Sequence, residues 1–99
     1  MPRNLESEYQ SKVCEKIEKL FPGCMLIKLD ANYIQGIPDW LLLFGKRWAT
    51  LEIKRNPKSS HQPNQDYYVN KMNNMSFSAF IFPENEKEVL DELQRSFKS

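Results

Sequence analysis

The spacing of the apolar residues changes several times along the chain, and these changes predict three helices and four strands. Apolar side chains recur every three or four positions, the spacing of one helix face, in three segments: 5–21, about 64–75, and 84–97. Shorter apolar runs have the length and composition of strands at 24–30, 39–44, 47–55 and 76–82. The predicted order of elements is therefore α-β-β-β-α-β-α.

Gly45-Lys46 joins the second and third predicted strands as a tight hairpin turn. Residues 40–44 are apolar throughout, which is typical of a central strand covered on both faces. Residues 47–55 alternate with a period of two, and the two sets that share a face are Ala49, Leu51 and Ile53, and Trp48, Thr50, Glu52 and Lys54. A turn at Gly45-Lys46 places Asp39 opposite Glu52 across the hairpin.

Length and composition indicate a single domain that spans residues 1–99. A chain of 99 residues can form one compact core and is too short for two. Hydrophobic residues make up 40% of the sequence, and six Phe, four Tyr and two Trp supply that core, which argues against a disordered chain.

The cysteines and the N-terminal segment indicate an intracellular protein. Cys14, Cys24 and the single His61 do not have the spacing of a zinc motif or of a redox pair, so we expect both cysteines to be core residues in a reducing compartment. Residues 1–20 are too charged for a signal peptide, and the apolar run 40–44 is far too short to cross a membrane. We therefore expect a cytoplasmic protein without a membrane partner.

Charge is distributed unevenly, although the formal net charge is only +1. Basic residues outnumber the single acid Glu52 between positions 46 and 58, whereas acids dominate residues 84–92. The basic half could face a polyanion while the acidic segment faces away from it. Two solvated faces of opposite sign are the simpler explanation of the same pattern.

Asp39, Glu52 and Lys54 form the candidate chemical site. Two carboxylates opposite one another repel, and a divalent cation such as Mg²⁺ or Mn²⁺ between them would reverse the sign of that interaction. Lys54 lies two residues beyond Glu52 on the same face, where it could reach a phosphate or an attacking water. A Glu-x-Lys alone is more commonly a solvated ion pair, and Pro-Asp alone is a common turn dipeptide, so the indication of phosphodiester hydrolysis lies in the combination.

The segments 36–39 (Gly-Ile-Pro-Asp) and 51–55 (Leu-Glu-Ile-Lys-Arg), after an N-terminal helix with Glu-Ser-Glu-Tyr-Gln, resemble the VRR-nuclease branch of the PD-(D/E)XK nuclease superfamily. The resemblance extends from Glu6 to Leu93. It implies an α/β fold with a restriction-endonuclease-like αβββαβ core, in which helices flank a central mixed four-stranded sheet. Stand-alone members of similar length resemble phage and bacterial enzymes that act as homodimers on Holliday junctions, and longer relatives carry the domain as a module in DNA-repair proteins. The resemblance thus implies a role in DNA recombination or repair.

The same resemblance implies a role for each site residue. Asp39, Glu52 and the backbone carbonyl of Ile53 would hold Mg²⁺ or Mn²⁺, and Lys54 would act on the phosphate or on the water. A glutamine that supports the site on the following helix is matched by Gln65. Gln62 is the alternative for that position, but it precedes Pro63 and is expected in the loop.

Glu6 is the best match to the acid that the family carries on its first helix, and the resemblance makes it a candidate further metal ligand. It lies within the buried stripe of that helix, whereas Glu8 lies nearly opposite to the stripe. A simple preference of acids for a helix N-terminus explains Glu6 equally well. Four basic residues fit contacts with the DNA backbone: Arg55, Lys58, Lys46 and Arg47. For Lys46 and Arg47, simple surface charge at the far end of the hairpin is a close alternative.

These features together predict a Mg²⁺-dependent, structure-selective DNA endonuclease. The chain is too small to carry a separate element that reads sequence, and a two-fold homodimer would present two sites to the two strands of a four-way junction. A non-catalytic DNA-binding module on the same fold and a sequence-specific restriction-type nuclease are the alternatives. We expect the protein in the cytoplasm of a bacterial host or of a phage-infected cell.

Overall fold

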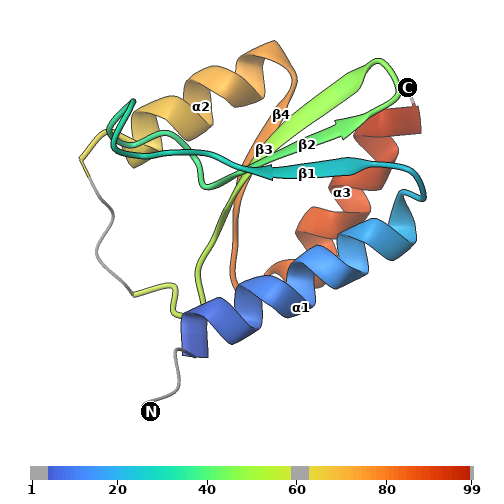
Figure 1. The fold of residues 1–99 in the computed structure, drawn as a ribbon, viewed down its shortest axis with the longest axis horizontal. Helices are drawn as coiled ribbons and strands as arrows, with labels where there is room; N and C mark the ends of the chain where they lie inside the picture. The colour runs from blue at the N-terminus through green and yellow to red at the C-terminus, as the bar shows by residue number, and fades with distance from the viewer. Residues whose placement is uncertain (1–4, 59–62, 99) are drawn as a thin grey trace.

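The computed structural model describes residues 5–58 and 63–98 and arranges them in three layers around one sheet (Figure 1). Its elements are, in chain order, α1 (Leu5–Leu20), β1 (Met25–Lys28), β2 (Trp40–Phe44), β3 (Arg47–Ile53), α2 (Gln65–Met75), β4 (Phe77–Ile81) and α3 (Glu86–Lys98). The strands lie in the order β1-β2-β3-β4, and the β3–β4 pair is parallel while the other two pairs are antiparallel. The predicted element order and the mixed four-stranded sheet are confirmed.

The main core lies between one face of the sheet and the two helices α1 and α3 (Figure 1). From β3 it takes Ala49, Leu51 and Ile53, which are fully buried, so the predicted alternation of this strand is confirmed. Helices α1 and α3 and strands β2 and β4 contribute other apolar side chains of this core: Val13, Ile17, Leu42, Phe77, Ile81, Val89, Leu90, Leu93 and Phe97. Cys14 and Cys24 are free and half-buried, packed against the edge of this core. No helix of the described segments is both long and apolar enough to span a membrane.

Helix α2 covers the opposite face of the sheet, because a parallel β3–β4 pair requires a crossover and α2 supplies it. Polar residues of β3 are therefore buried beneath α2: the Thr50 Oγ1 atom lies 2.8 Å from Ser78 Oγ and 3.3 Å from Met72 Sδ. Glu52 and Lys54, on the same face, are only 3% and 7% exposed. The interpretation of these two residues as a solvated ion pair is wrong for this reason.

The register of the hairpin places Asp39 and Glu52 side by side, as the sequence predicts. Trp40 pairs with Leu51, so one residue farther from the turn Asp39 lies opposite Glu52. The strand itself begins one residue later than expected, at Trp40, and the backbone N–H of Asp39 donates to Glu52 Oε1 at 3.1 Å.

Gly36 lets the loop between β1 and β2 approach the start of α2. Its φ is +91°, and a Cβ atom at this position would lie 2.5 Å from the carbonyl oxygen of Pro63 and 2.7 Å from Asn64 Cβ. No side chain fits at such a distance, and the positive φ favours glycine by itself. The loop that carries Asp39 is thus packed directly against the residue that precedes Gln65.

We expect Gly36→Ala to destabilise the protein more than Gly23→Ala. Both glycines have positive φ, at +91° and +88°, which costs an alanine about 1–2 kcal/mol, but only Gly36 has backbone atoms in the way of a Cβ. Urea unfolding followed by circular dichroism measures both variants. Equal losses of unfolding free energy would contradict the close packing of the loop against α2.

Candidate active site

A small cavity lies at the end of the β2–β3 hairpin that is opposite to its turn. Its volume is about 130 Å³, and its lining comes from α1, the β1–β2 loop, β3 and the start of α2: Glu6, Ala31, Gly36, Asp39, Glu52, Lys54 and Gln65. The predicted catalytic side chains therefore meet around one cavity, although they come from four separate segments of the chain.

Glu52 is the most buried acid of this cavity. Its Oε2 atom lies 3.8 Å from Lys54 Nζ, and both side chains are less than a tenth exposed. Burial, followed by the negative charge of Asp39, raises the pKa of Glu52 to about 7, and the nearby ammonium of Lys54 only partly opposes this rise. Burial and the charge of Asp39 therefore disfavour the charged form of Glu52 more than Lys54 favours it.

Asp39 is paired with a lysine that the sequence did not indicate. Its Oδ2 atom lies 3.3 Å from Lys28 Nζ, and Lys28 also lies over the ring of Trp40, with Nζ 5.0 Å from the ring centroid. Lys28 is the residue of β1 that pairs with Trp40 of β2. Only the register between these two strands, which the sequence did not predict, places Lys28 beside Asp39.

Gln10 connects α1 to the backbone carbonyl of Ile53, the predicted metal ligand. Its Nε2 atom donates to the backbone oxygen of Ile53 at 2.8 Å, and its Oε1 atom accepts from Trp40 Nε1 at 3.4 Å. The sequence places Gln10 one turn after Glu6 on the same helix face, without assigning it a role. The structure shows that it fixes α1 against the ends of β2 and β3.

Glu6 and Gln65 reach the cavity from two helices. Gln65, the first residue of α2, is 5% exposed, whereas Glu6 is exposed and lines the cavity from α1. Glu8 lines a different groove on the outer side of α1, so Glu6 is the acid of this helix that faces the site. Gln62, the alternative to Gln65, lies outside the described residues.

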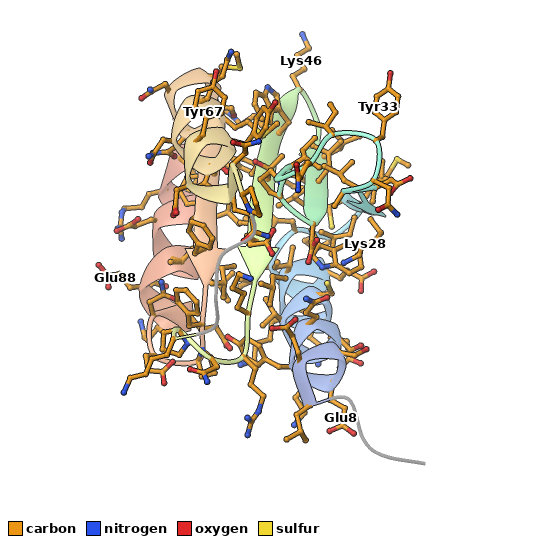
Figure 2. All side chains as sticks on the ribbon, turned by 90° about the vertical axis from the view of Figure 1, so that its left-hand side faces the viewer. Glu8, Lys28, Tyr33, Lys46, Tyr67 and Glu88 are labelled. Atoms are coloured by element: carbon orange, nitrogen blue, oxygen red, sulfur yellow. The ribbon has the colours of Figure 1, made fainter. Side chains whose placement is uncertain are left out.

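The four predicted DNA-contacting residues do not lie together. Arg55 and Lys58 are exposed, and they lie one and four residues after Lys54. Lys46 and Arg47 lie at the turn of the hairpin. Arg47 precedes Glu52 by five strand residues, which at the usual rise per residue separates their Cα atoms by about 17 Å. The Arg47 side chain donates to the backbone oxygen of Ser96, and Figure 2 shows Lys46 well separated from Lys28.

The cavity offers oxygen donors that fit Mg²⁺ or Mn²⁺. In the part of the chain that the structure describes, no group of three His, Cys, Asp or Glu side chains could hold a metal ion. Asp39 and Glu52 are nevertheless two adjacent carboxylates beside a cavity too small for most organic ligands. Mg²⁺ is commonly bound by one or two carboxylates together with water and substrate phosphate, so this donor set fits it.

Without added metal, we expect the stability of the wild type to fall with rising pH more steeply than that of Glu52→Gln. The folded-state pKa of Glu52, about 7, lies above its ordinary value of 4.5, so its contribution to folding is complete below pH 4.5 and is lost as pH rises through 7. Between pH 5 and pH 8 the wild type should lose roughly 2–3 kcal/mol more unfolding free energy than Glu52→Gln loses. Urea unfolding in EDTA measures it, with the exposed Glu88→Gln as the control; parallel pH profiles for wild type and Glu52→Gln would contradict the burial of a charged carboxylate.

No protein-family model matches the sequence, and no curated protein matches it either. One solved structure, described as a "VRR_NUC domain", superimposes on the chain with a TM-score of 0.70, covers 90% of this chain and 97% of its own, and is 18% identical in sequence. A likeness of this kind at low identity establishes the fold. The chain therefore has the fold of a VRR_NUC domain, as its sequence motifs implied.

Proposed function

We propose that the protein is a metal-dependent DNA endonuclease that acts on branched DNA, with the four-way junction as its preferred substrate. The observation that carries this proposal is the meeting of Asp39, Glu52, Lys54 and Gln65 around one cavity. The VRR_NUC description of the structural neighbour supports a nuclease over other activities on this fold. A module that only binds DNA has no physical reason to place two carboxylates together, because the pair repels both itself and the phosphates.

The proposed metal site consists of Asp39, Glu52 and the backbone carbonyl of Ile53. Bound there, Mg²⁺ or Mn²⁺ would supply activation of a water for attack on phosphorus and neutralisation of the charge that develops there. Gln10 already holds the Ile53 carbonyl from α1, which fixes the direction of that oxygen. Burial, and after it the negative charge of Asp39, raises the pKa of Glu52, so a cation bound beside it would favour the charged carboxylate.

Lys54 is the proposed catalytic cation. Its side chain is 9% exposed and lies on the same face as Glu52, so its ammonium acts where water screens it poorly. A positive charge held in this way stabilises the oxygens of the phosphate as the transition state forms, or orients the attacking water. Gln65 closes the cavity from the first turn of α2 and is proposed to hold Lys54 or the phosphate in position.

DNA would approach over the exposed residues that follow Lys54. Arg55 and Lys58 are placed to contact phosphates next to the cleaved one, and such contacts position the strand without reading its sequence. The described residues of one chain form one cavity lined in this way, so paired cuts in the two strands of a junction are proposed to use two chains related by a two-fold axis. The proposed active form is therefore a homodimer.

We expect the wild type to cut a labelled four-way junction in Mg²⁺ but not in EDTA, and Lys54→Met to cut it at least about 100-fold more slowly. The matched control is Lys71→Met, which removes an exposed lysine of α2 outside the cavity. Cleavage is measured beside a linear duplex of the same sequence, and light scattering on the same sample should give the mass of a dimer.

Each alternative has its own outcome in this experiment. Equal cutting of junction and duplex would retain the nuclease and reject the preference for branched DNA. Cutting of the duplex at one fixed sequence would indicate a restriction-type enzyme. Tight binding without cutting in Mg²⁺ or Mn²⁺ would indicate a DNA-binding module and overturn the proposal, and a monomer with full activity would overturn the dimer.

We expect Asp39→Asn to weaken Mn²⁺ binding by at least about tenfold in calorimetric titration of the protein without DNA, because it removes one of two carboxylate ligands. Asp91→Asn is the matched control, since Asp91 is also an aspartate in an ion pair, 2.7 Å from Lys87 Nζ, but lies on α3 away from the cavity. Equal Mn²⁺ affinities of Asp39→Asn and the wild type would reject the metal site.

A further inference from the structure

A second hollow adjoins the cavity, between α1 and the ends of β1 and β2. This groove has a volume of about 510 Å³, shares Glu6 and Asp39 with the cavity, and is otherwise lined by Ser7, Gln10, Ser11, Lys28 and Trp40. Lys28 is the basic residue of the groove. Figure 2 shows its side chain at the side of the molecule where α1 meets the sheet.

The ion pair between Lys28 and Asp39 is weak enough to exchange. The side chain of Lys28 is 52% exposed and that of Asp39 is 23% exposed, so water screens their attraction across 3.3 Å. A divalent cation bound by Asp39 and Glu52 carries twice the charge of the ammonium and would compete for the same Asp39 carboxylate. Lys28 and the metal therefore cannot both hold Asp39 at full strength.

Lys28 remains beside the site after this exchange, because the backbone and Trp40 hold it there. Lys28 pairs with Trp40 across β1 and β2. The backbone N–H of the next residue, Leu29, donates to the backbone carbonyl oxygen of Asp39 at 2.8 Å. Its ammonium also lies over the Trp40 ring, an attraction that does not depend on Asp39. A lysine that loses its carboxylate here becomes an available cation next to the catalytic cavity.

We propose that Lys28 has two partners in turn: Asp39 when no metal is bound, and a phosphate of the DNA strand in the groove once a divalent cation has taken Asp39. The inference rests on the proposed function, since the strand in the groove is the substrate. Lys28 is thereby a DNA-binding residue whose contribution depends on the metal. This coupling lets the site hold the strand firmly only when the metal is present.

The experiment compares Lys28→Ala with the unchanged chain in two binding measurements. Calorimetric titration with Mn²⁺, without DNA, should show two- to fivefold tighter binding by the variant, about the strength of the exposed ion pair that no longer competes. Fluorescence anisotropy with a labelled four-way junction is measured in a Lys54→Met background, so that cutting is slow compared with the binding measurement. In Mn²⁺, Lys28→Ala should reduce the slope of log affinity against log salt by about 1, and in EDTA it should leave the slope nearly unchanged.

Lys71→Ala is the control, because Lys71 is also an exposed lysine over an aromatic ring, 5.6 Å from the centroid of Tyr67, but lies outside the groove. It should change neither measurement. An equal loss of junction affinity in Mn²⁺ and in EDTA would overturn the exchange, and tighter Mn²⁺ binding with unchanged junction binding would show that Lys28 turns to Glu6 or to water instead of DNA. If neither the unchanged chain nor Lys28→Ala binds Mn²⁺, the proposed function itself is rejected, and this inference with it.

Discussion

The repulsion between Asp39 and Glu52 is the interaction on which the rest of the site depends. The pairing of β2 with β3 fixes both acids at one end of the hairpin, where the backbone N–H of Asp39 donates to Glu52 Oε1. Two lysines from different segments of the chain offset part of this repulsion: Lys54 lies beside Glu52, and Lys28 lies beside Asp39. The pKa of Glu52 is nevertheless raised, so the lysines only partly offset its burial and the repulsion from Asp39.

The crossover helix determines how strongly these charges act. The parallel pairing of β3 with β4 brings α2 over the polar face of the sheet, so Glu52 and Lys54 lie in a medium where water screens them poorly. The same helix begins at Gln65, and the close approach of Gly36 to Asn64 joins its first turn to the loop that carries Asp39. One packing arrangement thus buries the charges and assembles the cavity around them.

The size and position of the cavity agree with the chemistry proposed for it. A space of about 130 Å³ lined by carboxylates, an ammonium and an amide suits an ion, a water and part of a phosphate group. The larger groove beside it is open and polar, as a path for a charged backbone should be. Lys46 and Arg47 lie at the other end of the hairpin, so uneven charge along the sequence does not correspond to one basic face around the cavity.

The sequence by itself determined the element order, the hairpin register and the set of acids at its end, because periodicity and turn residues are local properties that packing did not override. It could not show that Glu52 and Lys54 are buried, since their alternation with apolar residues is the same whether a helix or water covers that face. It also gave no indication of Lys28 or of the bond from Gln10 to Ile53, because both depend on how β1 and α1 lie against the hairpin. Tertiary structure alone decided those contacts, by joining segments whose relative positions no local pattern encodes.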